Sequence, residues 1–113
     1  DIDSLAVRAT IDNSILNNID QAKLQVCQGS IEEIALILKK DKVDVLLCNI
    51  LAPVIEDLAP RFIDIVKDDG KIILSGLLTT QALRLEEVLL NLGWKVYSLE
   101  KKDSWCSLLV SRC

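Results

Sequence analysis

The residues Val43-Asp44-Val45-Leu46-Leu47-Cys48-Asn49-Ile50-Leu51-Ala52-Pro53 are the most informative segment of this chain about its fold. Its first six residues are apolar except for Asp44, which is typical of a short strand that is covered on both faces in a parallel α/β sheet. Pro53 suits the first turn of a following helix, where its missing N–H costs nothing. Asn49 is therefore predicted at the carboxyl end of a buried parallel strand, where open α/β sheets bind ligands. Because a buried amide without partners is costly, we expect a ligand or substrate to contact it.

The rest of the chain alternates between helical and strand patterns. Strand-like patterns cover residues 1–3, 23–27, 71–76, 94–99 and 106–110, and helical patterns cover residues 4–18, 30–40, 53–66 and 80–92. Expected helix N-caps are Ser4, Ser30 and Thr80, and Glu33 completes a capping box with Ser30. Pro60 should kink or break the third helix, and Asp69-Gly70 should form a turn.

The order of these elements predicts an α/β fold. Residues 1–113 are expected to form a single domain with a partial doubly wound, Rossmann-like sheet, mostly parallel, with a C-terminal antiparallel hairpin. The last two strands are expected to be antiparallel because residues 100–105 are too few for a crossover helix. Nicotinamide-binding Rossmann domains usually end in a further parallel unit, whereas S-adenosylmethionine-dependent methyltransferases end in such a hairpin.

Composition excludes several classes of function. Half of the 113 residues are hydrophobic, which is ample for one core, and the net charge is −4. Without a basic stripe, direct binding to nucleic acid is not expected, and no apolar run is long enough for a membrane span. The four cysteines form no C-x-x-C pair and histidine is absent, so we expect reduced thiols, no metal site and a cytoplasmic protein.

Four segments together carry a family resemblance: Asp1-Ile2-Asp3, Asn49-Ile50-Leu51-Ala52, Leu74-Ser75-Gly76-Leu77-Leu78 and Asp103-Ser104-Trp105-Cys106. Along essentially all of its length the chain resembles the C-terminal part of the methyltransferases that modify protein eleven of the large ribosomal subunit. The resemblance implies an S-adenosyl-L-methionine-dependent protein N-methyltransferase that acts on lysine and N-terminal amines. The family's glycine-rich loop and substrate-recognition domain would precede Asp1, so we expect a catalytic-domain fragment that is inactive by itself.

The resemblance also assigns cofactor-binding residues. It implies that the Asp1 carboxylate accepts hydrogen bonds from ribose hydroxyls and that Ile2 packs on adenine. It places Gly29 and Ser30 beside the adenine, and Asn49 next to the cofactor. The alternatives are a frayed terminal carboxylate at Asp1, a core position for Ile2, and a plain turn with a helix N-cap at Gly29 and Ser30.

Asn49 is the expected catalytic residue. Methylation of an amine needs alignment of a neutral nitrogen more than a strong base, and an amide oxygen can accept an N–H bond that aims the lone pair. Many amino-methyltransferases have two prolines and an aromatic residue after this position, whereas this chain has Ile50, Leu51 and Ala52. The departure favours a flexible amine over a nucleic-acid base. The alternative is a polar strand end whose amide is satisfied by backbone groups.

On the substrate side the resemblance places Leu51 and Trp105, with a hairpin aromatic that covers the core as the alternative for Trp105. Two rival functions also remain: a non-catalytic α/β binding domain, and a methyltransferase that acts on another amine. A glycine-rich segment upstream of Asp1 would favour an enzyme over a binding domain.

The family's strand order, three-two-one-four-five-seven-six, gives an expectation for the sheet. Without the first strand, residues 23–27 should either pair beside residues 43–48, or leave an apolar edge that a second copy of the chain covers. The four strands from Val43 onward should keep their order because all their neighbours are present. Self-association through this edge is therefore possible.

Overall fold

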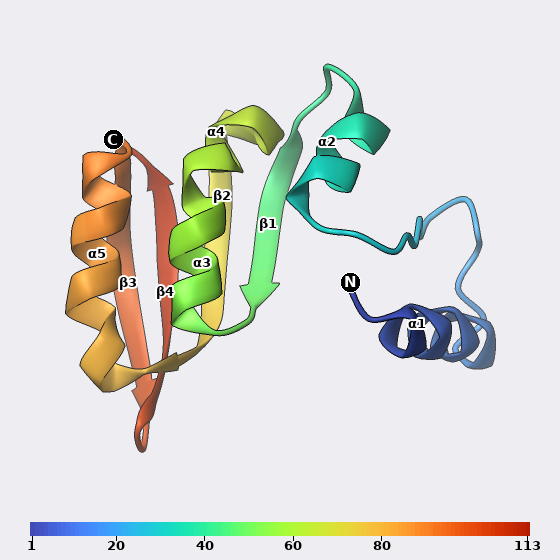
Figure 1. Ribbon diagram of the computed structural model, residues 1–113, viewed down its shortest axis with the longest axis horizontal. Coiled ribbons are helices and arrows are strands. Elements are labelled where there is room, and N and C mark those ends of the chain that lie inside the picture. The colour runs from blue at the N-terminus through green and yellow to red at the C-terminus, as the bar shows by residue number, and fades with distance from the viewer. The chain divides into compact units, whose positions relative to one another are not determined.

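Two compact units make up the chain, Asp1–Lys39 and Lys40–Cys113. They are seen in a computed structural model that describes all of residues 1–113. The first unit holds helix α1 (Ser4–Leu16) and helix α2 (Ile31–Leu38) (Figure 1). That residues 1–113 form a single domain stays a prediction.

The two helices of the first unit begin with different caps. The capping box at α2 is confirmed, because the backbone N–H of Ser30 donates to Oε2 of Glu33 at 2.7 Å. The prediction of Ser4 as the cap of α1 is wrong. The cap is Asp3, whose carboxylate accepts the N–H of Leu5 at 2.8 Å, so that Ser4 is already the first helical residue.

Residues 23–27 do not form the predicted strand, and residues 1–3 do not form a strand end. One pair of backbone hydrogen bonds, in the pattern of a parallel bridge, joins Asp1 to the segment that follows residue 26. The amino group of Asp1 donates to the Cys27 carbonyl at 3.4 Å, and the N–H of Gly29 donates to the Asp1 carbonyl at 2.8 Å. A single pair of hydrogen bonds does not make a ladder, so neither segment is a strand.

The second unit contains a four-stranded sheet (Figure 1). Its elements are β1 (Val43–Asn49), α3 (Ala52–Leu58), a 3-10 turn (Ala59–Arg61), α4 (Phe62–Ile65), β2 (Val66–Leu78), a second 3-10 turn (Thr79–Gln81), α5 (Ala82–Asn91), β3 (Trp94–Lys102) and β4 (Trp105–Arg112). The strand order is β1-β2-β4-β3. β1 is parallel to β2, while β4 is antiparallel to both β2 and β3.

This topology confirms the predicted α/β class and the order of the last four strands. Three strands, β1, β2 and β3, run in the same direction, and the C-terminal hairpin supplies the reversed one. The predicted break at Pro60 is confirmed by the 3-10 turn between α3 and α4. Pro53 lies in the first turn of α3, as expected.

Two local predictions in this unit are wrong. Asp69 and Gly70 do not form a turn but lie inside β2, where the register with β1 shifts after the pair Val43 and Val66. The strand absorbs the extra residues as an irregularity and continues. Thr80 does not cap α5, because it lies within the 3-10 turn. There the side chain of Gln81 accepts the N–H of Leu78 at 3.0 Å.

The core of the second unit lies on one face of its sheet, the face on which α3 and α5 pack side by side (Figure 1). The largest buried side chains include Trp94, Phe62, Ile55, Ile72, Leu74, Leu85, Leu89, Leu108 and Val110. On the opposite face Leu47, Ile73 and Leu109 are direct partners across β1, β2 and β4. Leu47 is 71% exposed and Ile73 is 40% exposed.

The prediction that residues 43–48 are covered on both faces is therefore wrong. β1 is an edge strand with one hydrogen-bonded neighbour, β2, and no helix of the second unit packs on its open face. Pairing of residues 23–27 beside it is also wrong. Coverage of this edge by a second copy stays a prediction. No helix is both long and apolar enough to cross a membrane.

Candidate functional site

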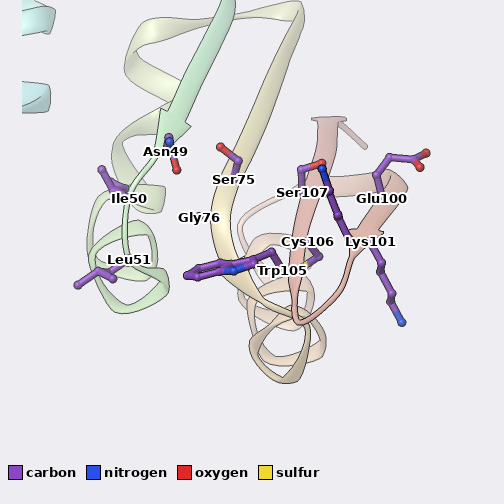
Figure 2. A pocket seen from close by; sticks show the side chains of 11 residues that line it. Asn49, Ile50, Leu51, Ser75, Gly76, Glu100, Lys101, Trp105, Cys106 and Ser107 are labelled. Atoms are coloured by element: carbon purple, nitrogen blue, oxygen red, sulfur yellow. The ribbon is translucent and has the colours of Figure 1, made fainter.

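A pocket of about 700 Å³ opens at the carboxyl ends of β1 and β2. Because these strands are parallel and Asn49 is the ladder partner of Ser75, both strand ends deliver polar side chains to the same edge. The end of the β3–β4 hairpin closes another side, as Figure 2 shows. The lining residues are Asn49, Ile50, Leu51, Ser75, Gly76, Glu100, Lys101, Lys102, Trp105, Cys106 and Ser107.

Asn49 is the last residue of β1, and its amide is available to a ligand. The residue is exposed, and its side chain makes no hydrogen bond to any other part of the chain. The alternative of an amide satisfied by backbone groups does not match this geometry. Figure 2 shows the amide and the Ser75 hydroxyl pointing into the space between the two strand ends.

Leu51 and Trp105 form an apolar wall of the same pocket. Leu51 is 70% exposed and Trp105 is 55% exposed. In Figure 2 the indole ring reaches from the start of β4 toward Leu51. A hairpin aromatic that covered the core would bury its ring, so the exposure of Trp105 favours a role in lining the pocket. Asn49, Leu51 and Trp105 thus line one pocket, and their roles toward the substrate stay a prediction.

Several lining residues were not predicted from the sequence, above all Ser75, Gly76 and Ser107. A usable signal was present, because residues 71–76 were predicted as the next parallel strand and their last residues must end beside Asn49. Cys106 also lines the pocket. Burial raises the pKa of its thiol, although nearby Lys101 opposes the shift. The thiol is therefore protonated at neutral pH and is no activated nucleophile.

The first unit gathers the other predicted cofactor residues. The N–H of Gly29 donates a hydrogen bond to the carbonyl of Asp1, and the side chain of Gln28 donates to the carbonyl of Ile2 at 3.2 Å. Oδ1 of Asp1 accepts the N–H of Asp3 at 2.9 Å, which leaves Oδ2 without a partner in the chain. Ile2 presents its side chain to solvent, 76% exposed.

Gly29 and Ser30 have less to offer a ligand. Their backbone N–H groups are already bonded, to Asp1 and to Glu33. Gly29 has φ +147°, and a Cβ there would lie 2.4 Å from Cγ of Glu33, so glycine is needed to let the capping box close. This geometry favours a capped turn, which leaves a ligand little more than apolar contact. No cluster of three or more histidine, cysteine or acidic side chains is placed to hold a metal.

Comparisons with known proteins agree with one another. The model of the family "Ribosomal protein L11 methyltransferase (PrmA)" matches residues 1–113. The chain is 50% identical over 112 residues to the ribosomal protein L11 methyltransferase of Parasynechococcus marenigrum, covering 99% of the chain and 39% of that relative. It is 47% identical over 112 residues to the protein of the same name from Prochlorococcus marinus, covering 99% of the chain and 37% of the relative.

The fold has a match among solved structures. The crystal structure of the ribosomal protein L11 methylase from Lactobacillus delbrueckii subsp. bulgaricus superposes with a TM-score of 0.87 at 27% identity. The match covers 99% of this chain and 55% of the other. The chain thus spans well under half the length of the curated relatives it matches.

Proposed function

Because the chain belongs to the ribosomal protein L11 methyltransferase family, we propose that the protein carrying these residues transfers methyl groups from S-adenosyl-L-methionine to amines of that ribosomal protein. One observation carries the proposal beyond family membership. The amide of Asn49 has no partner in the chain and lies at the carboxyl end of a parallel strand, in a pocket with an aromatic wall.

The residues of the first unit fit the nucleoside part of the cofactor. A ribose diol needs a two-oxygen acceptor, and Asp1 keeps one carboxylate oxygen without a partner in the chain. Adenine needs an apolar surface, which the exposed side chain of Ile2 provides next to that carboxylate. We assign Gly29 and Ser30 to the border of the adenine, by contact. When bound, the cofactor supplies a methyl group on a positively charged sulfur.

Asn49 acts on the accepting amine. Its Oδ1 accepts an N–H bond from the neutral amine, which turns the nitrogen lone pair toward the methyl group. Because an amide carries no charge, it does not stabilise the ammonium form of the amine, as a carboxylate would. Leu51 and Trp105 hold the apolar stem of a lysine side chain, or the residue next to an N-terminal amine, along the pocket wall.

Replacement of Asn49 tests the proposal. In the full-length protein that carries these residues, Asn49→Ala should lower kcat by about 10²-fold, roughly 2.7 kcal/mol of transition-state stabilisation, because alignment is lost. The Tm should not change, since the side chain makes no hydrogen bond. Asn91→Ala, at the exposed end of α5, is the matched control. Normal methylation of the ribosomal protein by the Asn49 variant would remove Asn49 from the mechanism.

The proposal also covers the partners of the protein and its location in the cell. The net charge of −4 suits a protein that recognises its substrate through protein contacts and without binding nucleic acid. We place the protein in the cytoplasm, where ribosomal proteins are made. The bare edge of β1, with Leu47 71% exposed, is a surface through which copies of the chain associate.

A further inference from the structure

An irregularity in β2 lies directly beside Asn49. Opposite β4, the register passes from Leu74 and Leu108 to Leu77 and Cys106. Ser75 and Gly76 together therefore face the single residue Ser107, which is the pattern of a β-bulge. Gly76 has φ +75°, the left-handed region that suits glycine. Bulges next to functional sites redirect side chains, and this one lies in the pocket wall.

The space that a side chain at position 76 would need is already taken by neighbouring atoms. A Cβ at this position would lie 2.6 Å from Oδ1 of Asn49, and 3.4 Å from both the N and the O of Ile50. The first distance is far inside van der Waals contact. Oδ1 of Asn49 thus lies close to the backbone of β2, too near to the position of a Cβ for any residue but glycine to fit without a shift.

We infer that Gly76 is a positioning residue that sets the direction of the Asn49 amide. Asn49 makes no hydrogen bond within the chain, so no polar partner fixes its orientation. The orientation of the Asn49 amide is limited by its contact with the bulge. The amide lies across the end of β1, with its oxygen against β2. A side chain at position 76 would turn the amide out of this place. The inference rests on the proposed function only where it concerns turnover.

The orientation of the amide can be measured without cofactor or substrate. In the full-length protein that carries these residues, the Nδ2 resonances of Asn49 are assigned by their loss in Asn49→Ala. Gly76→Ala should shift them and increase their motion. Gly93→Ala is the matched control, because Gly93 also has positive φ, +83°, but a Cβ there meets only Nη1 of Arg112 at 3.7 Å. Asn49 resonances that stay in place in Gly76→Ala would overturn the inference.

A stability cycle separates the contact from backbone strain. Both glycine variants carry the penalty of positive φ, but only Gly76→Ala meets Asn49. Asn49→Ala should therefore relieve part of the destabilisation that Gly76→Ala causes, and should relieve none of that caused by Gly93→Ala. If Gly76→Ala does not fold, the double variant with Asn49→Ala should recover folding. Equal destabilisation by Gly76→Ala with and without the Asn49 side chain would refute the contact.

Turnover by the full-length protein gives the last measurement. Gly76→Ala should lower kcat about 10-fold to 100-fold, with the KM for the cofactor little changed, and should have no further effect in an Asn49→Ala background. If Asn49→Ala leaves kcat unchanged, the catalytic role proposed for Asn49 fails, while the resonance shifts still test the inference. Equal losses of kcat in both backgrounds would contradict the positioning role.

Discussion

Adjacent isoleucines on β2 test which face of the sheet is the core. Ile72 is 0% exposed on the face that carries the helices, and Ile73 is 40% exposed on the open face. Ile72→Val removes one buried methylene and leaves a small cavity, at a cost of about 1 kcal/mol. Ile73→Val removes a methylene that is partly in water already. At ~0.8 kcal/mol per fully buried methylene, its cost is about 0.5 kcal/mol, with no cavity contribution.

The two substitutions form a matched pair because chemistry, strand and β-propensity are the same. With a urea m-value of about 1 kcal/mol/M, the unfolding midpoint should fall by roughly 1 M for Ile72→Val and about 0.5 M for Ile73→Val. Circular dichroism of the 113-residue chain measures both. Equal shifts would refute the one-sided core and show that the open face is covered in solution. A shift for Ile73→Val that grows with protein concentration would identify the cover as a second copy.

Four further outcomes are expected. The hydrogen bond from the Ser30 N–H lowers the pKa of Glu33. The stability that this carboxylate gives to α2 is therefore present above the unfolded pKa and is lost as the pH falls through the lower folded pKa. Glu33→Gln should remove this pH dependence from acid titrations followed by circular dichroism. Lys67→Gln should raise the pKa of Asp44, which the 2.6 Å hydrogen bond from Lys67 lowers; a ¹³C titration that shows no change would contradict the pairing. Asn49→Asp should move the rising limb of the pH–rate profile to higher pH, because a carboxylate stabilises the ammonium substrate. Calorimetric titration of the 113-residue chain with S-adenosyl-L-methionine should show feeble binding or none, and a micromolar constant would mean that the cofactor site is misplaced.

The candidate site was partly accessible from the sequence. Asn49 and Trp105 were found because each stands out in its own segment: an amide at the end of an apolar run, and an aromatic next to a cysteine after a short turn. Gly76 was not found. Its role depends on a bulge opposite Ser107 and on the Asn49 side chain, which lies 27 residues earlier, and no local pattern contains that contact.

Local sequence patterns were enough to predict the α/β class, the direction of the last four strands and the helix break at Pro60, because periodicity, connection length and proline geometry are local properties. Tertiary structure decided what depends on neighbours. Residues 23–27 have strand periodicity but are not a strand, because the hydrogen bonds between this segment and Asp1 do not continue into a ladder. The apolar pattern of β1 predicts a strand that is covered on both faces, but the strand is exposed on one face. Burial depends on which elements pack against a strand, and the strand's own sequence does not contain that information.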